Sequence, residues 1–143
     1  MPMIEDYWGV RGIFEAELEH GAPFRWLTIE STLWIPHQEG NYFIFNLFSP
    51  FEDLEQVITL HLDHNKKPVQ LVLLNGWHQY AVARTTEEYM TITALKALPR
   101  KTDERILTVR VSTIKITDHI PQEVVETEKK IAQLRATAAH ALS

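Results

Sequence analysis

The stretch VQLVLLNGWHQYAVAR, residues 69–84, decides the fold that the sequence predicts. It consists of two apolar runs joined by Asn75-Gly76, the strongest short-range signal for a two-residue β-hairpin turn, because both residues tolerate positive φ. With that turn, Leu71 lies opposite Tyr80. We therefore predict an antiparallel hairpin that the neighbouring segments extend into a sheet.

Residues directly opposed across this hairpin share a face of the sheet, and successive residues alternate between the two faces. The more apolar face is expected to point to the core, and it carries Val69, Leu71, Leu73, His78, Tyr80 and Val82. The other face is more mixed and is expected to be partly wet, and it carries Gln70, Val72, Leu74, Trp77, Gln79 and Ala81. A slip of the register by one residue would bury both glutamines, which argues against it.

Six further segments alternate apolar and polar residues or are apolar nearly throughout, and turns rich in Gly, Pro, Asn and Asp separate them. They span residues 8–19, 24–35, 42–48, 56–63, 89–96 and 105–117. The last of them changes phase midway, and a β-bulge near Ser112-Thr113 would keep its apolar residues on the core side.

The C-terminal segment has a different pattern. Pro121 and an acidic first turn predict the start of an α-helix over about residues 121–142. An apolar stripe runs along this helix at spacings of three, four and seven, and it consists of Val124, Ile131, Leu134, Ala138 and Leu142. Such a stripe needs a sheet, a barrel mouth or a partner chain to cover it.

Eight candidate strands joined by short connections favour pairing between neighbours in the sequence. We therefore predict a mainly β fold, an eight-stranded antiparallel meander closed as a barrel or roll, with the α-helix after the last strand. Residues 1–143 are interpreted as a single β-barrel-like domain. The alternative is a pleckstrin-homology-like arrangement of seven strands and a C-terminal helix, which requires one of the eight strands to be spurious.

The order of elements resembles the lipocalin-like (calycin) architecture, an eight-stranded up-and-down barrel with a helix after the last strand. Lipocalins carry a Gly-x-Trp near the first strand, whereas this sequence has Trp8-Gly9 with the residues reversed. The resemblance covers most of the chain at the level of element order, and no binding residue is carried over from it.

Composition narrows the classes of function. The formal net charge is −5, which argues against binding to a nucleic-acid backbone. The sequence has no cysteine, so neither disulfides nor thiolate metal ligands are expected. No secretory signal and no apolar run of membrane-spanning length are visible, so we expect a cytoplasmic protein without a membrane span.

The densest polar group is His61-Leu62-Asp63-His64. An imidazole and a carboxylate on one strand face can ligate zinc or pair as base and orienting group, but strand ends are also commonly polar and solvated. The sequence nominates no third ligand, so metal binding by these residues stays open. No hydrolase motif and no glycine-rich phosphate loop is present. We assign no catalytic residue, no cofactor and no metal ligand, and the sequence gives enzymatic activity no support.

The aromatic residues are the larger signal. Trp26 and Trp34 lie on the strand face opposite Leu27 and Leu33, where two indoles in plain solvent would be costly, although they also suit a core beneath the helix. We predict a non-catalytic binding module that holds a small apolar or aromatic ligand in a β-barrel-like pocket. The predicted ligand-binding residues are Trp26, Trp34, Tyr42, Trp77, His78 and Tyr80.

A second function fits the same residues. An exposed aromatic face favours a protein–protein adaptor or inhibitor, including a homodimer, because interfaces concentrate aromatic side chains at their desolvated centres. The acidic net charge would then steer the chain toward a basic partner. For His78 the simpler interpretation is a position at the sheet rim, with a backbone or water partner for the imidazole.

Overall fold

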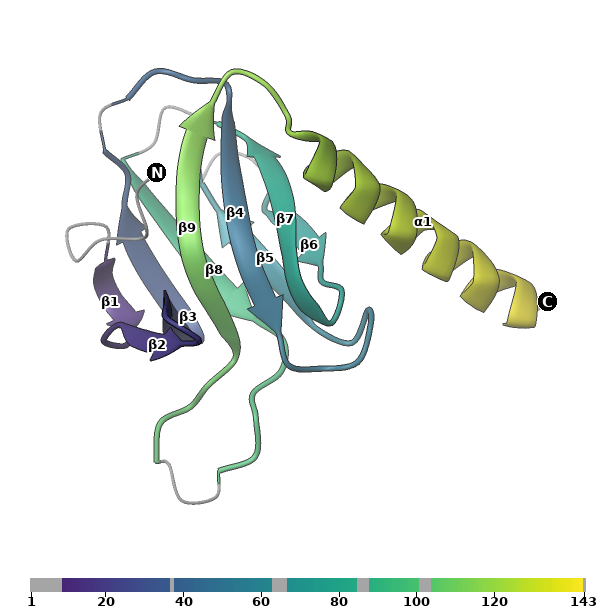
Figure 1. Ribbon diagram of the computed structural model, residues 1–143, viewed down its shortest axis with the longest axis horizontal. Coiled ribbons are helices and arrows are strands. Elements are labelled where there is room, and N and C mark those ends of the chain that lie inside the picture. The colour runs from purple at the N-terminus through teal and green to yellow at the C-terminus, as the bar shows by residue number, and fades with distance from the viewer. Residues whose placement is uncertain (1–8, 37, 63–66, 85–87, 101–103, 143) are drawn as a thin grey trace.

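The computed structural model describes residues 9–36, 38–62, 67–84, 88–100 and 104–142 (Figure 1). Within these residues the chain forms nine strands followed by one α-helix. The strands are β1 (Gly9–Ile13), β2 (Glu17–Glu19), β3 (Ala22–Trp34), β4 (Tyr42–Ser49), β5 (Val57–His61), β6 (Val69–Val72), β7 (Gly76–Ala83), β8 (Tyr89–Ala94) and β9 (Val109–Thr117). The helix α1 spans Gln122–Leu142.

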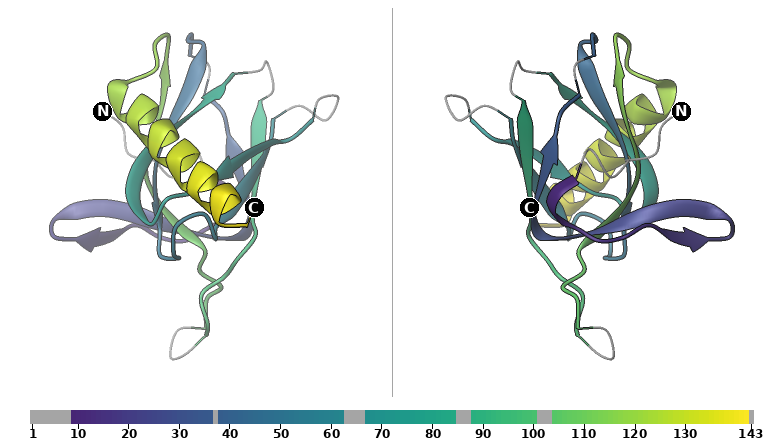
Figure 2. Two further views of the ribbon diagram at one scale, coloured as in Figure 1. Left: turned by 90° about the vertical axis from the view of Figure 1, so that its right-hand side faces the viewer. Right: turned by 90° about the vertical axis from the view of Figure 1, so that its left-hand side faces the viewer.

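The strands form one antiparallel sheet, which curls into a nearly closed barrel (Figure 2). Its order is β6-β5-β8-β3-β9-β4-β7, with β1 and β2 paired to β3 beside this path. The predicted mainly β, antiparallel, barrel-like fold with a C-terminal helix is therefore confirmed. Each of the eight predicted segments contains a strand, and the first contains two, so none of them is spurious as the seven-strand alternative would require.

The predicted connectivity is wrong in its central element. β6 and β7 do not pair with each other, and they stand at opposite ends of the strand order. A type I′ turn requires positive φ at both central residues, but only Gly76 has it, with φ of 90°. The chain before it is held elsewhere: the Leu73 N–H donates to the Gln56 carbonyl (2.9 Å), and the Asn75 N–H donates to Asp53 Oδ1 (2.6 Å).

A meander is also excluded by β3, the longest strand. Its residues 30–34 pair with β8, whereas residues 25–27 pair with β9. One strand thus joins two halves of the barrel, and most neighbours in space are distant in the sequence. The predicted bulge in β9 is confirmed, since the register with β4 shifts at Ser112, and Val109, Val111 and Ile114 are all buried.

The barrel interior is filled by large apolar side chains. The core cluster draws its buried side chains from six strands and from the segments next to them, and its fully buried members include Leu27, Leu33, Phe43, Phe45, Leu47, Ile58, Leu60, Leu73 and Met90. On the predicted core face of the hairpin, Tyr80 and Val82 belong to this cluster. Val69 is 36% exposed and His78 is half-buried, because the two strands diverge instead of pairing.

The helix begins directly after Pro121, as predicted, and packs against β7. Val124 is fully buried, Ile131 packs against the core cluster, and Leu134 is half-buried, whereas Ala138 is exposed. The Leu142 side chain lies outside the described residues. Figure 2 shows α1 lying across one side of the barrel. Among the described residues, no helix combines the length and the apolar character that crossing a membrane requires.

Candidate functional site

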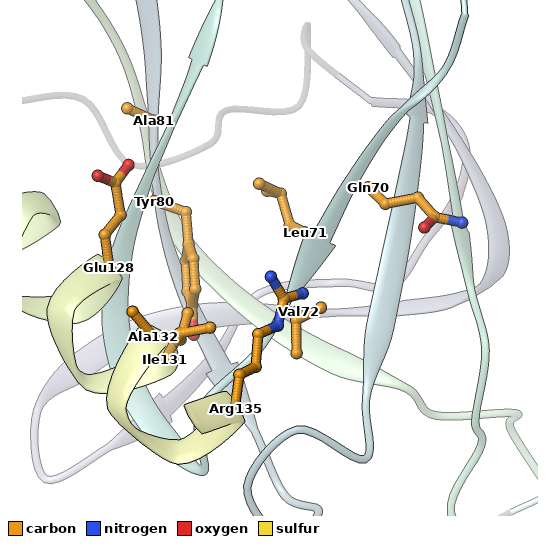
Figure 3. Close-up of a pocket in the computed structure, with 9 residues that line it drawn as sticks. All are labelled: Gln70, Leu71, Val72, Tyr80, Ala81, Glu128, Ile131, Ala132 and Arg135. Atoms are coloured by element: carbon orange, nitrogen blue, oxygen red, sulfur yellow. The ribbon is translucent and has the colours of Figure 1, made fainter. Parts of the chain in front are cut away.

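A groove lies where the barrel is split between its two edge strands. Residues of β6, β7 and α1 line it together, and its volume is about 230 Å³ (Figure 3). Its apolar surface comes from Leu71, Val72, Tyr80, Ala81, Ile131 and Ala132. Its polar groups are Gln70 of β6 and Glu128 and Arg135 of α1. We call this feature the α1 groove.

The helical repeat explains the α1 wall of the groove. Residues three or four apart lie on one flank of an α-helix. The α1 residues that line the groove have this spacing, and they are residues 128, 131, 132 and 135. The Ile131 side chain at the centre of this flank also packs against the core cluster. The helix therefore seals part of the split and leaves the remainder open beside β6.

Backbone groups of both edge strands point toward the split. The Leu73 N–H donates to the Gln56 carbonyl and the Arg84 N–H donates to the Asn41 carbonyl, and each bond continues a ladder to the strand on the far side. In an antiparallel pair such bonding residues alternate with residues that point the other way. Gln70 and Val72 of β6, and Ala81 of β7, thus direct their N–H and C=O groups to the groove.

Tyr80 joins the groove to the barrel interior. Its side chain is 5% exposed and belongs to the core cluster, and it also lines the groove. The phenol oxygen accepts a hydrogen bond of 3.0 Å from the Leu74 N–H, which fixes the ring. Burial raises the pKa of Tyr80 to about 12, with a smaller contribution from the carboxylate of Asp53. The phenol is therefore neutral over the physiological range.

His78 lies on the other flank of α1. It lines a second groove of about 490 Å³ together with Leu74, Asn75 and Lys130. Its Nε2 lies 2.9 Å from the Asn75 carbonyl oxygen, which is the backbone partner that the simpler interpretation of this histidine expected. This contact orients the imidazole at the strand end, away from the α1 groove.

Trp26 and Trp77 belong to a cross-strand row on the outer face of the barrel. Trp26 of β3 pairs with Arg110 of β9, Arg110 with Phe48 of β4, and Phe48 with Trp77 of β7. The Arg110 guanidinium lies 4.8 Å from the ring centroids of both Trp26 and Phe48, and 4.4 Å from that of Phe24. We call these five side chains the aromatic row.

The aromatic row explains how Trp26 lies opposite the core face without a cavity. Trp26 is only 6% exposed, because Arg110 and Phe24 cover it and Glu19 of β2 forms an ion pair with Arg110. Guanidinium groups stack well on indole and phenyl faces, where the positive charge meets the electron-rich ring. Sequence reasoning missed Arg110, although its place between Val109 and Val111 on a strand marks it as facing outward.

Trp34 and Tyr42 lie in two other places. Trp34 is 36% exposed and pairs across the strands with Tyr89, which is 51% exposed. Tyr42 is half-buried between Ala83 and Thr117. Of the six predicted ligand-binding residues, Tyr80 alone lines the α1 groove, and the six do not converge on one site.

Sequence reasoning did not bring Leu71, Ile131 and Arg135 together, because they meet only through the split between β6 and β7. The sequence signal for this site was the helical spacing that placed Ile131 on the buried stripe of the helix. Among the described residues, no group of three or more His, Asp or Glu side chains is placed to hold a metal ion. His61 is exposed, and Asp63, His64 and Trp8 lie outside the described residues.

Comparisons with protein-family models, curated protein sequences and solved structures give no match to this chain.

Proposed function

We propose that this protein is a non-catalytic binding module that holds a small apolar or aromatic ligand in the α1 groove. One observation carries the proposal: the groove opens between two edge strands that do not pair with each other in the described part of the chain, and the ring of a buried tyrosine forms part of its wall. A binding pocket is typically concave and mostly apolar, with a few polar groups that orient the ligand.

The size of the groove limits the ligand. A volume of 230 Å³ lies below the range of about 300–1,000 Å³ that is usual for pockets of drug-sized ligands, so a small one- or two-ring aromatic body suits it. The large side chains packed inside the barrel favour this groove over the barrel axis as the place of the ligand.

Filling the groove with a bulky side chain tests the proposal. Ala132 lines the groove and Ala136 is exposed elsewhere on the same helix, so Ala132→Trp and Ala136→Trp form a matched pair. We expect the wild type and Ala136→Trp to show saturable emission changes with environment-sensitive aromatic dyes. Ala132→Trp should weaken that uptake at least about tenfold, because the indole occupies the ligand volume. Equal uptake by all three proteins, or none by the wild type, would refute the proposal.

A second candidate function rests on Trp34 and Tyr89. These two aromatic side chains lie opposite each other on β3 and β8 and are both exposed, which suits the centre of a protein interface, including that of a homodimer. Trp34→Ala should then lower the mass of the assembly measured by light scattering, or lower the affinity for a protein partner, while the melting temperature stays the same. A wild type that is monomeric at all concentrations and binds no partner would remove this candidate.

A further inference from the structure

We propose that the ligand of the α1 groove carries a negative charge, a carboxylate on its apolar body, and that Arg135 binds it. This inference rests on the proposed function and names the chemical class of the ligand. It follows from the placement of the charged groups around the groove.

Arg135 is the cation that lines the α1 groove. Among the described residues, the ion pairs engage Arg11, Lys96, Arg105 and Arg110, and no carboxylate pairs with Arg135. In Figure 3 its side chain rises from α1 and its guanidinium lies beside Leu71 and Val72. A cation that borders an apolar wall in this way offers an anionic ligand both a counter-ion and a surface for its apolar body.

Glu128 gives the groove a direction. It precedes Arg135 by seven residues, which is about 10 Å along an α-helix. In Figure 3 its carboxylate lies next to Ala81, at the opposite end from the Arg135 guanidinium. A ligand anion is therefore attracted to the Arg135 end and repelled from the Glu128 end, so the charges select one orientation as well as one sign.

Polar groups of β6 complete the anion site. Gln70 lines the groove at β6, and the backbone of Gln70 and Val72 points to the split. Amide N–H groups and a guanidinium together match the two oxygens of a carboxylate, which accepts bidentate hydrogen bonds from arginine. The volume left for the apolar body suits one or two rings, so an aromatic carboxylate fits best.

The test compares naphthoate with naphthylmethanol, two ligands with the same rings that differ in charge. Titration calorimetry of the wild type should show that naphthoate binds about tenfold more tightly, the effect of one charge-assisted contact in a partly open site. Arg135→Gln should abolish this preference, because naphthoate loses its counter-ion and naphthylmethanol has no charge to lose. Because Arg135 is exposed, the variant is expected to fold, and the neutral ligand reports on the intact groove.

Two further variants separate a local contact from the overall charge. Glu128→Gln should raise the affinity for naphthoate about twofold, because it removes the repelling carboxylate. Lys129→Gln removes a positive charge from an exposed position beside the groove and should leave the preference unchanged. A wild type that binds both ligands equally, or a preference that survives in Arg135→Gln, would refute the anion site but not the proposal that the α1 groove binds apolar ligands. Failure of both ligands to bind would remove the proposed function itself.

Discussion

Replacing Arg110 by alanine is expected to lower the free energy of unfolding by about 2–4 kcal/mol. The guanidinium stacks on three rings at 4.4–4.8 Å, and each such contact contributes about 0.5–1 kcal/mol. The ion pair with Glu19, which is partly exposed, adds about 0.2–1 kcal/mol. Removal of Arg110 also uncovers Trp26, so apolar surface is returned to water. For a chain of 143 residues this corresponds to a drop of roughly 5–15 °C in melting temperature.

Thermal and urea unfolding of four variants measures this effect and assigns its source. Arg110→Lys keeps the charge but loses the planar stack, so it should fall between the wild type and Arg110→Ala. Glu19→Gln removes the ion pair alone and should cost less than about 1 kcal/mol. Arg11→Ala is the matched control, since Arg11 pairs across the strands with Glu30 at an exposed site and stacks on no ring that the structure describes. If Arg110→Ala is no more destabilising than Arg11→Ala, the aromatic row contributes nothing and the reasoning is refuted.

Three further predictions concern stability. Ile131→Asp should lower the free energy of unfolding by about 2–4 kcal/mol, because it places a charge against the core. Ala136→Asp, at an exposed position of α1, should lower it by less than about 0.5 kcal/mol. Thermal melts that show equal losses for the two variants would contradict the docking of α1. The pKa of Tyr80 is raised in the folded state, from 10.0 to about 12. The stability that the neutral phenol contributes to the folded state is therefore complete below pH 10 and is lost as the pH rises to about 12. The stability difference between the wild type and Tyr80→Phe should therefore shrink by about 2–3 kcal/mol over that range, and a constant difference in urea titrations would disprove the assignment. Gly12→Ala should destabilise the fold by several kcal/mol more than Gly21→Ala. Both glycines have positive φ, but only at Gly12 would a Cβ collide with a backbone carbonyl of β3. Similar melting temperatures for the two variants would count against this prediction.

The elements themselves are local consequences of the sequence, and these were predicted. All eight predicted strand segments contain strands, and the helix begins after Pro121, because alternation of apolar residues and the restricted φ of proline act over a few residues. The bulge at Ser112 was also predicted, since a change of phase within one strand is visible without knowledge of its partners. Such features depend on neighbours along the chain, and a sequence displays those neighbours directly.

The candidate site could be predicted only in part. Tyr80 was placed on the core face, and it does line the α1 groove, because alternation in its strand is a local property. Trp26 was placed on the face opposite Leu27, which is also correct in direction. That its cover is Arg110, which lies 84 residues further along the chain, depends on the pairing of β3 with β9. No local pattern announces a contact between residues so far apart.

Strand pairing was decided by the tertiary structure alone. Asn75-Gly76 is the strongest local hairpin signal in the chain, yet β6 pairs with β5 and β7 pairs with β4. The local preference of a two-residue turn is worth little against two complete strand ladders and the burial of Leu73 and Tyr80 in the core. The α1 groove exists because these ladders separate the two strands. The position of the groove is therefore determined by the pairing of strands that are distant in the sequence, and the two residues of the turn contain no information about that pairing.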